Sequence, residues 1–71
     1  MVTLHCIALE GEGLTGVNWY RCKEDRDAQL GKTGAQEEVA FDIEVPFAAS
    51  DERKTELADA AAWNKSYLDT K

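Results

Sequence analysis

Residues 38–45 read EVAFDIEV, and this stretch decides the fold. Every odd-numbered position carries a bulky apolar side chain, whereas the even-numbered positions carry three acids and one alanine. Because side chains of a strand alternate between two faces, this pattern predicts a β-strand with one buried and one solvent-facing side. Pro46 cannot donate a ladder hydrogen bond, so we expect the strand to end there.

The segment after this strand predicts a helix from about 51 to 68. Ser50 is a typical N-cap, and Asp51 and Glu52 complement the positive end of the helix dipole. Projected at about 100° per residue, the helix carries one stripe that we expect to face the sheet. The stripe comprises Leu57, Ala60, Ala61, Asn64, Tyr67 and Leu68, with Trp63 at its margin.

The segment before residues 38–45 predicts a β-hairpin. Residues 2–9 carry apolar side chains on both faces, which is typical of a central or well-covered strand. Residues 10–16 hold three glycines and predict a turn, and residues 17–23 regain strand propensity. Pairing of these strands would place Cys6 opposite or next to Cys22.

Residues 24–36 are polar, without a sustained period, and predict a long exposed loop, with a short helical turn around 25–30 as the alternative. The predicted order is therefore strand, strand, strand, helix. We expect one α+β domain over residues 1–71, a three-stranded antiparallel β-meander with one C-terminal helix packed on one face.

The composition limits the classes of protein that this chain can belong to. It has 71 residues, of which 44% are hydrophobic, and this suffices for one modest core. No segment reaches the roughly 20 apolar residues of a membrane helix, and no export signal is recognisable. We therefore expect no membrane contact, a cytoplasmic location and free thiols at Cys6 and Cys22.

The sequence favours binding over catalysis. His5 is the single histidine, it alternates in direction with Cys6 on a strand, and no Cys-x-x-Cys or phosphate-binding glycine motif occurs. No nucleophile with an adjacent base can be assembled from these residues. We expect no enzyme activity, no metal site and no cofactor.

Charge is segregated along the chain. Residues 1–36 hold five acids and four bases, whereas residues 37–71 hold nine acids and four bases, within a formal net charge of −6. Such an acidic surface can attract a basic groove of a partner protein and steer the encounter. The predicted partner-binding carboxylates are Glu38, Asp42, Glu44, Asp51, Glu52, Glu56 and Asp59.

A second set of residues combines aromatic and basic side chains. Trp19, Tyr20 and Arg21 are residue types that commonly anchor protein interfaces, and we take them as second-choice anchors. The run from Trp19 to Lys32 also permits an alternative function as a small nucleic-acid-binding or regulatory module. Its bases are interspersed with acids, so direct nucleic-acid binding is the weaker hypothesis. A third hypothesis is a structural subunit that associates with copies of itself.

In its gross properties the chain resembles one class of proteins, the small accessory proteins of phages and mobile elements, which include anti-CRISPR and other anti-defence inhibitors. The resemblance is one of small size, acidity and lack of catalytic residues, and it assigns no role to any residue. It implies a stoichiometric inhibitor that occludes a basic, nucleic-acid-binding surface of its partner.

Overall fold

The computed structural model describes residues 1–11, 13 and 15–64, and it has an α+β fold. The elements follow in the order β1 (Val2–Glu10), β2 (Gly16–Tyr20), α1 (Lys23–Gln29), β3 (Glu37–Val45) and α2 (Asp51–Asn64). The three strands are antiparallel and form one open sheet. The predicted α+β class, with three antiparallel strands followed by a helix, is therefore confirmed.

The strand order corrects the predicted meander. The sheet runs β2-β1-β3, so β3 pairs with β1 and not with β2. Thr3 lies opposite Glu44, and Cys6 lies between Trp19 on β2 and Phe41 on β3. The central place of β1 agrees with its apolar residues on both faces, since both faces of this strand are covered.

A second helix replaces the first part of the predicted loop. Residues 23–29 form α1, so the predicted long exposed loop is wrong for residues 24–29, where the alternative of a short helical turn around 25–30 fits, whereas residues 30–36 form a loop. The second strand ends at Tyr20 and not at residue 23, because Cys22 already precedes the first turn of α1. Cys6 consequently lies opposite Trp19, and both cysteines are free thiols.

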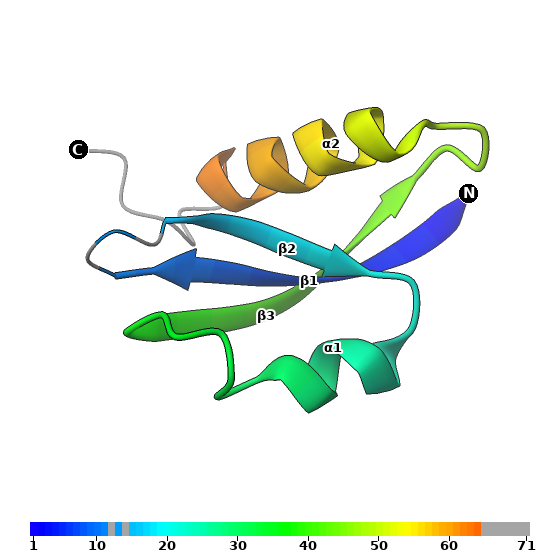
Figure 1. Ribbon diagram of the computed structural model, residues 1–71. Coiled ribbons are helices and arrows are strands. Elements are labelled where there is room, and N and C mark those ends of the chain that lie inside the picture. The colour runs from blue at the N-terminus through cyan, green and yellow to red at the C-terminus, as the bar shows by residue number, and fades with distance from the viewer. Residues whose placement is uncertain (12, 14, 65–71) are drawn as a thin grey trace.

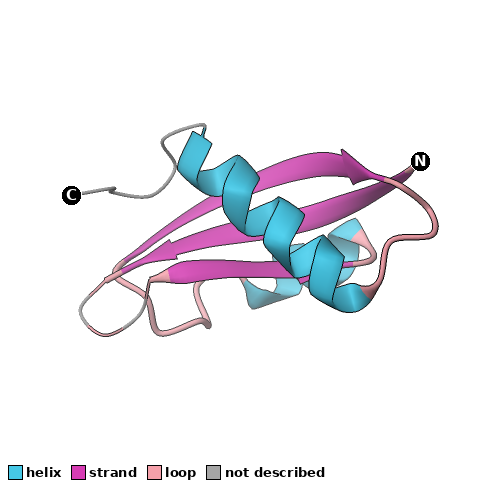
Figure 2. Ribbon diagram, turned by 90° about the horizontal axis from the view of Figure 1, so that it is seen from above, coloured by secondary structure: helices cyan, strands magenta, loops and turns pink. Residues whose placement is uncertain are grey.

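The two helices lie on opposite sides of the sheet (Figure 1). Viewed from above, α2 crosses the strands diagonally, with α1 beyond the sheet (Figure 2). The face below α2 holds the main core, which comprises Leu4, Cys6, Ala8, Phe41, Val45, Ala58 and Ala62. Ile7 alternates with these residues, is fully buried and therefore belongs to the face that α1 covers.

The buried stripe of α2 is rotated from the predicted one. Ala58 and Ala62 are completely buried, while Leu57 and Ala61 are half-buried and Ala60 and Asn64 are exposed. Two alanines facing the strands let the helix lie close to the sheet. The predicted members Tyr67 and Leu68, like the predicted end of the helix at 68, lie outside the described residues. Among the helices of the described part, none is long and apolar enough to cross a membrane.

Candidate protein-binding groove at the edge of the sheet

The predicted carboxylates do not form one surface. Glu38, Asp42 and Glu44 occupy the even positions of β3, whose odd positions face the core below α2. These three acids therefore lie on the α1 side of the sheet. The four helix acids belong to α2, on the other side. The sheet itself separates the two groups, so a single acidic face over strand and helix is not formed.

Asp42 is bound within the fold. Arg26 of α1 is only 5% exposed, and its Nη1 donates to Asp42 Oδ1 at 3.1 Å. The same Nη1 lies 3.4 Å from the carbonyl oxygens of both Cys6 and Phe41, and Nε donates to Asp27 Oδ1 at 2.7 Å. Arg26 is thus a buried cation that joins α1 to β1 and β3.

The charge of Arg26 is stabilised by its surroundings. Burial alone would lower its pKa, but the hydrogen bond and charge of Asp27, followed by those of Asp42, outweigh it and raise the pKa. His5 adds a second contact to Asp42, because its Nδ1 lies 3.1 Å from the same Oδ1. The carboxylate of Asp42 therefore has a structural role, because its Oδ1 already contacts both Arg26 and His5.

Glu38 binds the segment that connects α1 to β3. The backbone N–H of Gly31 donates to its Oε1 at 2.6 Å, and the Thr33 hydroxyl donates to Oε2. The bonds from Thr33 and Gly31 lower the pKa of Glu38, because both favour the charged carboxylate. Gly31 has φ of +82°, a conformation that glycine adopts at little cost.

The acids of α2 differ in how far they are engaged. Asp51 accepts a hydrogen bond from Arg21 at 3.1 Å and has Lys54 at 3.8 Å. Asp59 accepts from the Trp63 indole at 3.2 Å. Of the remaining two, Glu56 lies 3.7 Å from Arg53 and Glu52 is exposed in the first turn. These are surface contacts of small energy.

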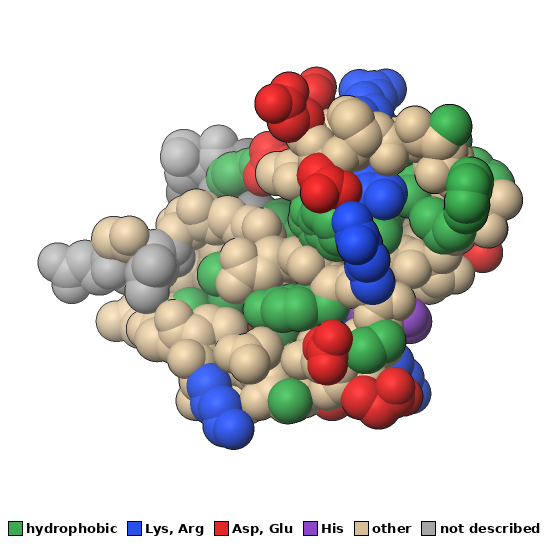
Figure 3. Space-filling model, turned by 45° about the vertical axis from the view of Figure 1, so that its right-hand side comes forward, with side chains coloured by type: hydrophobic (Ala, Val, Ile, Leu, Met, Phe, Trp, Pro, Cys, Tyr) green, Lys and Arg blue, Asp and Glu red, His purple; other side chains and the backbone are tan. Residues whose placement is uncertain are grey.

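The aromatic–basic run is divided between the faces of the sheet. Trp19 packs against the core below α2 and donates from Nε1 to Thr55 Oγ1 at 2.8 Å. Tyr20 follows it and points to the other face, and Arg26 is buried. Arg21 and Lys54 hold their cations 5.8 and 5.7 Å from the Trp19 ring centroid. Figure 3 shows acidic and basic side chains interspersed over one face, without a continuous basic platform.

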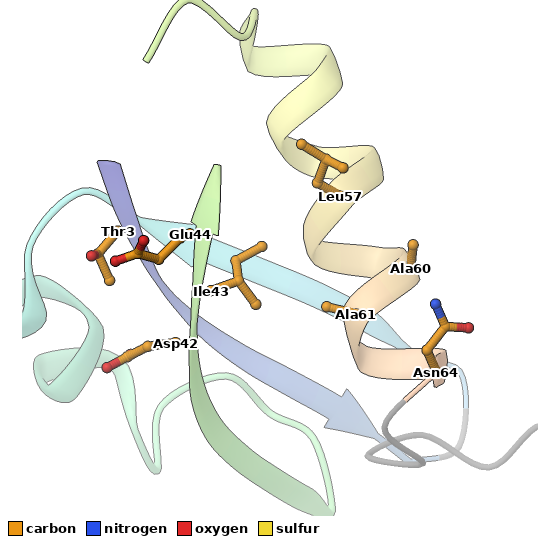
Figure 4. Close-up of a pocket in the computed structure, with 8 residues that line it drawn as sticks. All are labelled: Thr3, Asp42, Ile43, Glu44, Leu57, Ala60, Ala61 and Asn64. Atoms are coloured by element: carbon orange, nitrogen blue, oxygen red, sulfur yellow. The ribbon is translucent and has the colours of Figure 1, made fainter. Parts of the chain in front are cut away.

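The structure instead forms a groove where β3 and α2 meet. Its volume is about 570 Å³, and it is lined by Thr3, Asp42, Ile43, Glu44, Leu57, Ala60, Ala61 and Asn64. Ile43 points toward Leu57 and Ala61 of α2, whereas Asp42 and Glu44 point to the other side of β3 (Figure 4). The groove therefore extends around the edge strand and presents an apolar wall on one side and carboxylates on the other.

The position and size of the groove follow from small residues on α2. The helix is anchored above β2 by the bond between Trp19 and Thr55. On its opposite flank, Ala60 and Ala61 are too short to fill the space above Ile43. Both alanines belong to the predicted core stripe, and the sequence therefore did not predict the groove. The signal was present, since the helical period places Ala60 about 200° from both Ala58 and Ala62, so it cannot face the sheet together with them.

Glu44 is the carboxylate that the fold leaves available in this groove. It is exposed, and within the described residues no hydrogen bond or ion pair holds it. The lining residues include two acids and no base. The groove thus combines negative charge with apolar surface, which suits a partner that presents both basic and apolar side chains.

In the described ranges, 1–11, 13 and 15–64, no group of three or more His, Cys, Asp or Glu side chains is placed to hold a metal ion. Comparisons of the chain with protein-family models, with curated proteins and with solved structures give no match. The candidate site accordingly rests on the geometry of this chain.

Proposed function

We propose that this chain is a small, non-catalytic binding protein that docks a basic surface of a partner protein in the groove between β3 and α2. The observation that carries the proposal is the pairing of Glu44, which is exposed, with the apolar wall formed by Ile43, Leu57 and Ala61. In this proposal Glu44 supplies the charge contact and the apolar wall supplies the area that is removed from water.

The overall charge supports the same function. A net charge of −6 on 71 residues creates a negative field that accelerates encounter with a cationic partner at low salt. The exposed acids of α2, Glu52 and Glu56, contribute to this field from outside the groove. The proposed location is the cytoplasm, and the proposed biological role is stoichiometric inhibition of a nucleic-acid-binding partner, as the class resemblance implies.

Affinity capture from a lysate of the source organism tests this function. The wild-type protein is compared with the double variant Glu44→Gln/Ala60→Gln, which removes the free charge and narrows the groove. Glu24→Gln is the matched control, because it removes one exposed acid from α1, outside the groove. Purified partner is then titrated at several salt concentrations, with a nucleic acid as competitor.

We expect the wild type and Glu24→Gln to bind the same partner at one-to-one stoichiometry, with affinity that falls as salt rises. The double variant should bind at least about tenfold more weakly, a change of about 1.4 kcal/mol. Nucleic acid should compete with the protein for the partner. Equal affinity of the double variant and the control would contradict the proposed function. So would an affinity of the wild type for its partner that does not change with salt concentration.

A further inference from the structure

β3, a strand of nine residues, lies at one edge of the sheet. β3 pairs with β1 on one side only, and among the described residues no strand pairs with its other side. Every second residue of such an edge turns its backbone N–H and C=O groups outward, ready to bind another strand. Nine residues extend over about 30 Å, enough for a strand of ordinary length.

The side chains next to this edge differ between its two sides. On the α2 side lie Ile43 and the apolar wall of Leu57 and Ala61. On the α1 side lie Asp42 and Glu44, two positions apart and therefore about 6.6 Å apart along the strand. A strand added here would turn alternate side chains to the apolar wall and to the carboxylates.

A second copy of this chain does not fit the same edge. In a symmetric antiparallel pair of β3 strands, even positions of one copy lie opposite even positions of the other. In registers centred on any residue from 40 to 44, at least one pair of the carboxylates of 38, 42 and 44 would then lie directly opposite each other, and like charges in this position destabilise a sheet. The acids thus protect the edge from self-pairing and leave it open to a basic strand.

From this arrangement we infer that β3 accepts an extended segment of the partner as a fourth strand, in which Lys or Arg alternates with apolar residues. The inference rests on the proposed function and specifies its binding mode: backbone hydrogen bonds to β3 supply the register. The basic side chains of the segment contact Glu44, and its apolar side chains fill the groove beside Ile43 (Figure 4).

The probe is an end-capped peptide of roughly eight residues that alternates valine and lysine. A peptide of the same composition with its valines and lysines in two separate blocks is the control. Binding is followed by NMR of the full chain, through amide shifts and hydrogen exchange. We expect the alternating peptide to slow the exchange of outward-facing amides in residues 37–45 by at least about tenfold at saturation. The block peptide should leave these rates unchanged.

Variants separate the strand mode from simple charge attraction. Glu44→Gln should weaken binding of the alternating peptide about threefold to fivefold, whereas Glu24→Gln should not.

If the alternating peptide binds in a Glu44-dependent way but β3 amides gain no protection, strand addition is wrong while acidic docking stands. If the captured partner is insensitive to the groove variant, the proposed function itself fails. A dimer detected by light scattering, with β3 amides protected in the absence of peptide, would overturn the assignment of the edge to a partner.

Discussion

The Nη1 atom of Arg26 on α1 donates a hydrogen bond of 3.1 Å to Oδ1 of Asp42 on β3. The guanidinium that makes this contact is almost completely buried, and it also reaches the carbonyl oxygens of Cys6 and Phe41. One side chain therefore connects the short helix to the two strands that pair most extensively. In the described structure this contact fixes α1 against the face of the sheet opposite α2.

Replacement of Arg26 by Leu should destabilise the protein by about 2–3 kcal/mol. The carboxylates of Asp27 and Asp42 and the carbonyl oxygens of Cys6 and Phe41 would each lose a donor. Urea denaturation at neutral pH measures the free energy of unfolding. Arg21→Leu is the matched control: its side chain is 70% exposed, pairs with Asp51 and lies over the Trp19 ring, so a loss below about 1 kcal/mol is expected. Equal destabilisation by the two variants would contradict a structural role for Arg26.

Arg26 illustrates what the sequence could not predict. In the polar run 24–36 nothing distinguishes this arginine from its charged neighbours, since its burial depends on which strands lie below α1. The strand order was likewise not fixed by local pattern. An alternating strand such as β3 can pair on either side of the hairpin. The connection through α1 is long enough to cross the sheet, and it leads β3 to the far edge of β1.

Acid should destabilise the protein partly through Glu38. Its pKa is lowered in the folded protein by the bonds from Thr33 and Gly31, so the carboxylate form is the one that stabilises the fold. This contribution is fully present above the unfolded-state pKa of about 4.3 and is lost as pH falls through the lower folded-state value. Urea denaturation midpoints measured from pH 7 to pH 3 should therefore decline at the acidic end.

The variant Glu38→Gln identifies the group responsible. It should lower stability at pH 7 and make the acidic decline shallower than in the wild type. Glu52→Gln, in the first turn of α2, is the control and should retain the wild-type slope. A Glu38→Gln protein with an unchanged acidic slope would show that another carboxyl group causes the decline.

The two thiols should react at very different rates. Cys6 is fully buried, and burial, followed by the nearby charge of Asp42, raises its pKa to about 11. Since the thiolate is the reactive form, Cys6 should stay unmodified at pH 8 until the chain unfolds. Cys22 is half-buried at the start of α1 and is the thiol that should react first. Labelling with a chromogenic disulfide, with and without urea, counts the accessible thiols. A Cys22→Ser protein that still reacts rapidly without urea would contradict this ranking.

The error in the predicted acidic surface has a specific physical reason. The alternation of β3 places its acids together on one face, as the even positions require. The helix must cover the apolar face, so its own acids necessarily lie on the other side of the sheet from those of the strand. Patterning thus predicted each group of carboxylates but not their separation. Glu44 belongs to the groove because the alanine flank of α2 leaves space at the edge, and that space depends on the rotation of the helix.

The bond from Trp19 to Thr55 should make a measurable contribution to the attachment of α2 to β2. Thr55 accepts the indole N–H at 2.8 Å and donates its own hydroxyl to the carbonyl of Asp51 at 3.0 Å. Thr55→Val preserves the shape of the side chain but removes both bonds, and we expect a loss of about 1 kcal/mol. Thr55→Ser keeps the hydroxyl and should lose only a few tenths of that amount. Unfolding is followed by tryptophan fluorescence in a Trp63→Phe background, so that Trp19 alone reports. Equal stability of the Val and Ser variants would mean that apolar packing alone, without this bond, holds the helix above β2.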